Sequence, residues 1–139
     1  MRALIVYSKE GHVQELAKGL SEVLKRGSCQ VQLLEADAKE ASPISGAPYD
    51  LVIFGSPTLG FLGGKIAEDL TATSTRLTRL EGKNAAAFVT SKLFGTAKSL
   101  KAVMSLLEKQ GAMVQDFAAL QSPSDVEHFG ARLLKLMGR

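Results

Sequence analysis

A polar loop near the start of the chain, residues 8–12 (SKEGH), has the residue types and the position of a phosphate-binding loop. It follows the apolar run Ala-Leu-Ile-Val at residues 3–6, which predicts a buried strand. After it, apolar residues recur three or four places apart, the spacing of one helix face: Val13, Leu16, Leu20 and Leu24. Free backbone N–H groups and the helix dipole favour an anion where a strand turns into a helix. We therefore predict that residues 8–13 bind a phosphate.

Strand-like and helix-like segments alternate about five times along the chain. Further strands are expected at residues 30–35, 51–54, 84–89 and 113–117. Helices are expected from Gly64 or Lys65 onward, over 97–109 and over 126–136, with Ser124 and Glu127 as a capping box. Such alternation predicts an α/β fold with helices on both faces of a parallel sheet.

The apolar content of the strands predicts their order. The first, third and fourth strands are continuously apolar and suit the centre, whereas the second and fifth look like edges. That pattern fits a five-stranded parallel sheet of order 2-1-3-4-5 in a three-layer α/β/α sandwich, with residues 1–139 as one domain. Ligands of such sheets bind beyond the carboxyl ends of the strands. The loops 8–13, 56–64 and 90–96 should converge there.

Composition and charge exclude several classes of function. Hydrophobic residues make up 45% of the 139 residues and charged residues 22%, as in a soluble globular domain. No apolar run approaches the roughly 20 residues that span a membrane. The net charge of +3 comes from scattered lysines and arginines without interleaved aromatics, so no nucleic-acid partner is expected. The single cysteine, Cys29, suits a structural role in a reducing, cytoplasmic setting.

Familiar catalytic motifs are missing from the sequence. It contains neither the GxGxxG of dinucleotide-binding folds nor the GxxxxGK[ST] of P-loops. The first and third strands end in Ser8 and Ser56, without the acidic cluster of a phospho-receiver domain. No serine triad or set of metal ligands can be assembled, so we name no catalytic residue and no metal site.

Three segments in the right order resemble the flavodoxin-like family. They are residues 3–13 (ALIVYSKEGHV), 49–60 (YDLVIFGSPTLG) and 82–89 with the later Gly95 and Gly111-Ala112. The resemblance covers nearly the whole chain. The first loop is most similar to that of the Trp-repressor-binding-protein-like quinone oxidoreductases, whose form is Y-S-x-x-G-H-[IV].

The resemblance implies a non-covalently bound FMN. Its phosphate would be held by the Ser8 hydroxyl and the backbone N–H groups of Lys9 to Val13, with Gly11 allowing close approach and His12 a further donor. The other two loops would contact the rest of the flavin through Pro57, Thr58, Leu59, Gly60 and Phe61, and through Ser91, Lys92, Phe94 and Gly95. Phe61 and Phe94 are the candidates for stacking on the flavin ring, and each is equally suited to packing.

Two functions remain open on these grounds. In the first, the flavin carries electrons or reduces a small acceptor, and the protein holds it and tunes its potential. In the second, the domain has lost FMN and serves as a binding or interaction module. Glu10, a carboxylate in a phosphate loop, and Val13, which replaces the usual threonine, favour the second.

The expected partners follow from charge and length. A basic chain favours an acidic redox protein, or a small acceptor without any protein partner. The quinone-reductase branch carries insertions that assist tetramer formation, and 139 residues leave no room for them. We therefore expect a monomer or homodimer. A purely structural interpretation of the first loop also stays open, in which Ser8 and Gly11 only end the strand and start the helix.

Overall fold

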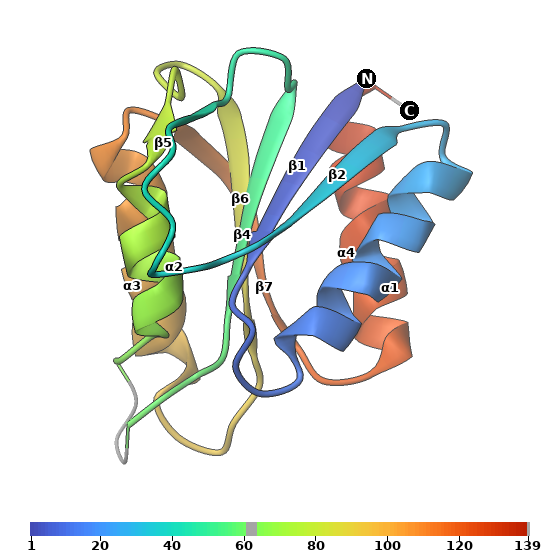
Figure 1. Cartoon of the computed structure of the whole chain (residues 1–139). Coiled ribbons are helices and arrows are strands. Elements are labelled where there is room, and N and C mark those ends of the chain that lie inside the picture. The colour runs from blue at the N-terminus through green and yellow to red at the C-terminus, as the bar shows by residue number, and fades with distance from the viewer. Residues whose placement is uncertain (61–63, 139) are drawn as a thin grey trace.

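The five apolar segments pair into one parallel sheet in the computed structural model, which describes residues 1–60 and 64–138 (Figure 1). Across the sheet the order is β2 (Gln30–Glu35), β1 (Arg2–Tyr7), β4 (Leu51–Ser56), β6 (Asn84–Thr90) and β7 (Met113–Leu120). In chain order this is 2-1-3-4-5, so the predicted topology is confirmed.

Two helices cover each face of this sheet and complete the predicted three layers. Helices α1 (Val13–Arg26) and α4 (Pro123–Leu136) pack side by side on one face, and α2 (Glu68–Ser74) and α3 (Thr96–Lys109) cover the other (Figure 1). None of the helices among the described residues has the length and apolar character needed to cross a membrane.

The alternation of side chains along the central strands explains their continuous apolar sequence. In β1, Ala3, Ile5 and Tyr7 pack with α1 and α4, whereas Leu4 and Val6 pack with α2 and α3. Strands β4 and β6 divide in the same way, so nearly every residue of the three strands is buried. Strands β2 and β7 alternate between half-buried and exposed positions, as expected of edges.

Small residues in β4 and β6 make room for one large ring. A Cβ added to Gly55 would lie 2.2 Å from Cζ of Phe88, so the phenyl ring occupies the space that a side chain would need. Phe88 in turn meets Phe129 of α4 edge-on, with ring centroids 6.5 Å apart. Both rings are fully buried and join α4 to the centre of the sheet.

The structure corrects three details of the sequence prediction. Helix α2 begins at Glu68 rather than at Gly64 or Lys65. The short segments β3 (Ile44–Ser45) and β5 (Leu77–Thr78) form a separate two-stranded parallel ladder that two residues could not signal by periodicity. The capping box of α4 uses Ser122 and Asp125, with Pro123 as the first helical residue, so the predicted pair Ser124–Glu127 is wrong.

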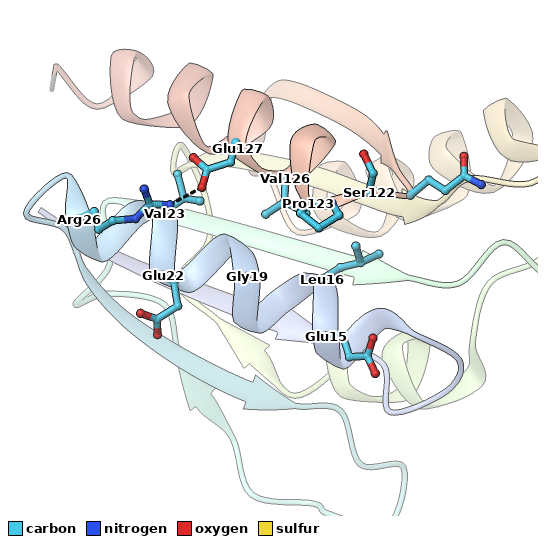
Figure 2. Close-up of a pocket in the computed structure, with 11 residues that line it drawn as sticks. Glu15, Leu16, Gly19, Glu22, Val23, Arg26, Ser122, Pro123, Val126 and Glu127 are labelled. Atoms are coloured by element: carbon cyan, nitrogen blue, oxygen red, sulfur yellow. Dashed lines mark hydrogen bonds and ion pairs between the residues drawn. The ribbon is translucent and has the colours of Figure 1, made fainter.

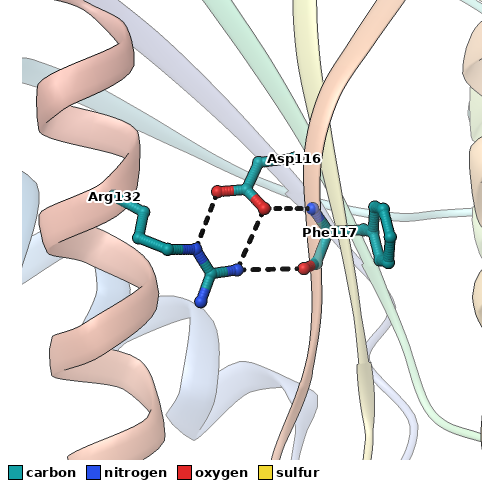
Figure 3. A network of polar contacts seen from close by, with 3 residues as sticks. All are labelled: Asp116, Phe117 and Arg132. Carbon is teal, nitrogen blue, oxygen red and sulfur yellow. Dashed lines mark hydrogen bonds and ion pairs between the residues drawn. The ribbon is translucent and has the colours of Figure 1, made fainter.

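An ion pair closes the exposed edge of the sheet at β7 (Figure 3). Nε and Nη2 of Arg132, from α4, each donate to a carboxylate oxygen of Asp116 at 2.9 Å. Nη2 also donates to the Phe117 carbonyl at 3.0 Å, and the Phe117 N–H donates to Asp116 Oδ1 at 2.8 Å. Both backbone groups of Phe117 are thus used, which blunts an edge that would otherwise invite a further strand.

The same contacts set the charge state of Asp116. Burial on its own raises the pKa of this carboxyl group, but the hydrogen bonds from Arg132 and from the Phe117 N–H outweigh it and hold the pKa below its ordinary value. A carboxyl group with a lowered folded-state pKa stabilises the fold at pH values above its unfolded-state pKa. That contribution is lost as pH falls through the folded-state pKa.

Replacing Arg132 by alanine should therefore lower the free energy of unfolding by about 1 kcal/mol at neutral pH. Part of this difference should disappear in acid, as Asp116 becomes protonated. Urea denaturation of both proteins at pH 7 and at acid pH measures it. Arg26→Ala is the control, because Arg26 pairs with exposed Glu127 but caps no backbone group. An equal effect of the two variants would contradict the role of Arg132 at the edge.

Replacing Gly55 by alanine should destabilise the fold by about 1–3 kcal/mol, because the new methyl group collides with the buried Phe88 ring. Gly19→Ala is the opposite control: its Cβ would meet Val126 Cγ1 at 3.4 Å, an accommodating distance, in the interior of α1. There the helix preference of alanine should leave stability unchanged or raise it. Thermal denaturation followed by circular dichroism compares the two, and tolerance of Gly55→Ala would refute the packing argument.

Candidate functional site

The loops that follow β1, β4 and β6 meet at one edge of the sheet, as predicted. They enclose a cavity of about 460 Å³ beyond the carboxyl ends of the strands. Its walls come from all three loops: Glu10, Gly11 and His12; Pro57, Thr58 and Leu59; Thr90, Ser91 and Lys92. Except for Thr90, each of these is a residue that the sequence analysis had placed at the site.

The first loop presents unpartnered backbone donors at the start of α1. Ser8 is fully buried, its N–H donates to the Gly55 carbonyl at 3.0 Å, and its Oγ accepts from the Glu10 N–H at 3.1 Å. Gly11 has a φ of +64°, a conformation that glycine adopts freely. Within residues 1–60 and 64–138, the N–H groups of Gly11, His12 and Val13 make no hydrogen bond. Such a row of donors is suited to an anion.

One donor of this loop is already engaged by a residue that the sequence analysis missed. The Lys9 N–H donates to Oδ2 of Asp69, from the first turn of α2, at 3.0 Å. No motif could have signalled this contact, because the two residues are 60 positions apart. Asp69 and Lys9 line a neighbouring cavity of about 530 Å³ together with Glu10, Ala38, Leu59, Lys65, Ile66 and Glu68.

The loops after β4 and β6 are joined by a reciprocal pair of threonines. The Thr58 N–H donates to Thr90 Oγ1 at 3.0 Å, and Thr58 Oγ1 donates to the Thr90 carbonyl at 2.6 Å. Ser56, also fully buried, accepts from the Ala67 N–H at 3.1 Å and donates to the Pro57 carbonyl at 2.9 Å. These hydrogen bonds hold the loops after β4 and β6 in place. Neither Ser56 nor Thr90 is among the predicted site residues.

In the loop after β4, backbone hydrogen bonds join two residues that lie six positions apart. Leu59 and Lys65 exchange backbone hydrogen bonds of 3.1 and 3.4 Å in an isolated antiparallel bridge. Gly60 has a φ of +88° and is exposed. Phe61, one of the two predicted stacking rings, lies outside the described residues.

The third loop holds its predicted aromatic away from the cavity. Thr96 Oγ1 accepts from the Lys92 N–H at 3.0 Å and donates to the Lys92 carbonyl at 2.9 Å, which folds residues 92–96 into a tight loop. Gly95, with a φ of +80°, precedes α3. The Phe94 side chain is 65% exposed and is not part of the cavity wall. Among the described residues, no other aromatic ring packs against it.

A third hollow, of about 330 Å³, lies between α1 and α4 (Figure 2). Leu16, Val23 and Val126 line its apolar part, and Arg26 donates a hydrogen bond to Glu127 at one end. It offers no row of free backbone donors and, in the part of the chain that the structure describes, no cluster of metal-binding side chains occurs here or elsewhere. The edge formed by the three loops is therefore the better candidate for chemistry.

Comparisons with known proteins were made by sequence and by structure. No protein-family model matches the chain, and no curated protein is significantly similar in sequence. Among solved structures, oxidised flavodoxin 1 from Bacillus cereus is similar with a TM-score of 0.74 at 20% identity, over 97% of this chain and 98% of that one. Flavodoxin 2 from the same organism gives 0.72 at 24% identity, over 98% and 99%.

A flavodoxin, WrbA-like protein from Agrobacterium tumefaciens is similar as well, with a TM-score of 0.67 at 16% identity, over 97% of this chain and 96% of that one. These matches extend over nearly the full length of both chains in each comparison. The chain has the flavodoxin-like fold.

Proposed function

We propose that the chain binds FMN non-covalently where the three loops meet, and that it carries electrons or reduces a small acceptor through that flavin. The observation that supports this most directly is the row of free N–H groups at Gly11, His12 and Val13, beside a cavity of about 460 Å³. Backbone donors at a helix N-terminus suit a phosphate, and the adjoining cavity is within the size range of ligand pockets.

The residues present fit such a ligand. The N–H groups of residues 11–13 would hold the phosphate, and Pro57 and Leu59 offer an apolar wall to the ring system. Ser8 is fully buried and does not line the cavity, so it braces the loop by accepting from the Glu10 N–H instead of reaching the ligand. The Thr58–Thr90 pair keeps that wall in place before any ligand arrives, which reduces the entropy lost on binding. Ser91 and Lys92 supply polar groups opposite.

In this proposal the flavin supplies the redox chemistry and the protein supplies the binding site. FMN, when bound, supplies the capacity to accept and return one or two electrons. The side chains around the cavity bind and orient the flavin and limit the access of water to it. No acid, base or nucleophile is required of the chain, and we assign none.

The proposal extends to the partner and the setting. The net charge of +3 and exposed lysines beside the cavity, Lys9, Lys65 and Lys92, suit an acidic redox protein or an anionic small acceptor. Electron transfer would take place in the cytoplasm, from a monomer or homodimer.

One observation favours the alternative function, a flavodoxin-fold module that binds a partner without flavin. The Asp69 carboxylate accepts the Lys9 N–H, and the exposed carboxylate of Glu10 follows directly. Negative charges so placed oppose a phosphate dianion. Under this alternative the protein takes up no flavin at any accessible concentration.

A charge-swap pair at Gly11 tests where the phosphate sits. Asparagine and aspartate have nearly the same shape and both tolerate a positive φ. A Cβ at residue 11 meets only Pro57 Cβ, at 3.6 Å. Gly11→Asp should bind FMN about tenfold or more weakly than Gly11→Asn, because a carboxylate faces the phosphate. Quenching of flavin emission and absorbance between about 350 and 500 nm measure the affinities.

Two results of that titration would count against the proposal. Equal affinities of Gly11→Asp and Gly11→Asn for FMN would remove the phosphate from this loop. Absence of FMN uptake by the unmodified protein, even at high micromolar concentration, would overturn flavin binding altogether and favour the interaction module.

A further inference from the structure

We infer that Asp69 is a specificity residue of the proposed flavin site: its carboxylate competes with the ligand phosphate for the first loop, so that the chain gains little from a phosphorylated flavin over an unphosphorylated one. This rests on the proposed function. It assigns a role to a residue outside the three loops that form the cavity wall.

The contact itself places an anionic oxygen where a phosphate oxygen would compete. Asp69 Oδ2 lies 3.0 Å from the Lys9 nitrogen, a normal hydrogen-bond distance. Lys9 belongs to the same run of backbone that offers the free N–H groups of residues 11–13. A carboxylate and a phosphate are the same kind of acceptor for such donors. The chain therefore satisfies part of its own anion-binding loop.

The position of Asp69 is fixed by the scaffold. Leu70, the next residue, is fully buried against the α2–α3 face of the sheet. Ala67, just before α2, is also fully buried, and its N–H donates to the buried Ser56 Oγ. Ala67 and Leu70, on either side of Asp69 in the sequence, thus anchor the start of α2. This anchoring directs the Asp69 side chain at the first loop.

The second oxygen of Asp69 shows that this contact is not a fully satisfied structural brace. Oδ1 is buried and, among the described residues, has no hydrogen-bond partner. Although Lys9 and Lys65 line the same cavity, neither is ion-paired with Asp69 in the part of the chain described. The residue as a whole is half-buried, so the cost falls on this one inaccessible oxygen, and an unsatisfied carboxylate oxygen beside a row of free N–H groups calls for an explanation.

The expected consequence is a low preference for FMN over riboflavin, which share the ring system and ribityl chain but differ in the phosphate. A phosphate dianion held by the first loop would be repelled by the negative charge of Asp69, which already occupies the Lys9 N–H of that loop. Riboflavin meets neither penalty. Removal of the charge at residue 69 should therefore act on FMN alone.

Asp69→Asn tests this by removing the charge while keeping the shape, and Asp69→Ala frees the Lys9 N–H as well. Each should raise the affinity for FMN about tenfold and leave that for riboflavin unchanged, as measured by quenching of flavin emission. Glu68→Gln is the matched control, because it removes the same charge from the adjacent exposed residue of the same cavity, which has no hydrogen bond to the loop. It should change both affinities less than about twofold.

Inorganic phosphate provides a readout that does not depend on flavin. Titrated into the ¹⁵N-labelled proteins, phosphate should shift the amide signals of residues 9–13 at about tenfold lower concentration in Asp69→Asn than in the unmodified protein. Thermal denaturation checks that each variant is folded. If no variant binds flavin but phosphate still binds the Asp69→Asn loop more tightly, the competition of Asp69 with an anion for the loop stands, whereas the proposed flavin function fails and with it the discrimination between FMN and riboflavin.

Three results overturn the inference. Unchanged affinities of Asp69→Asn for both FMN and phosphate would mean that the carboxylate does not compete. A loss of FMN affinity in folded Asp69→Asn would make Asp69 a brace that the site needs. An equal gain for FMN and riboflavin would place its effect on the flavin ring rather than on the phosphate.

Discussion

The burial of three parallel strands on both faces is the constraint on which this structure depends. In β1, β4 and β6 almost no side chain reaches solvent, so the backbone groups must be paired within the sheet itself. At the carboxyl ends, the pairing of β1 with β4 stops at Tyr7 and Gly55, and that of β4 with β6 stops at Ser56 and Val89. Beyond it the chain turns into loops and helices, and unpaired donors become available. The candidate site lies at this carboxyl end of the strands, where the loops after β1, β4 and β6 meet.

Close packing under that edge makes the site rigid. Gly55 and the alanines of β6 let the sheet and its helices approach, and Phe88 fills the space above Gly55. Just beyond β4 and at the last residue of β6, Thr58 and Thr90 hold the loops together: Thr58 Oγ1 donates to the Thr90 carbonyl, and Thr90 Oγ1 accepts from the Thr58 N–H. Packing in the core and hydrogen bonding in the loops thus form one continuous support, which fixes the shape of the cavity without any ligand.

The sequence predicted the features that follow from burial of apolar side chains, such as the order of the strands. It missed the features that follow from the course of the backbone between elements, such as where a helix starts. Continuous apolar runs against alternating ones identified the central and edge strands, and hence the strand order and the three converging loops. The start of α2 was misplaced because residues 60–67 carry no periodicity; it is fixed by the bond between Ala67 and Ser56. The capping box was misplaced by two residues because Ser122 and Ser124 both precede an acidic residue by three positions. Pro123 decides between them, since proline is favoured at the first helical position.

The role of Asp69 was missed for the same reason. Its meeting with Lys9 depends on where α2 starts, and a helix that began three residues earlier would turn a different side chain toward the loop. The charge around the first loop is therefore set by two segments that are distant in the sequence. The first segment supplies free donors at Gly11, His12 and Val13 and uses its own Ser8 Oγ to accept from the Glu10 N–H, and the second segment engages the Lys9 N–H with a carboxylate. A loop divided in this way holds its shape without a ligand, because one anion is already present. It also yields only part of the electrostatic gain that an empty set of donors gives to a phosphate.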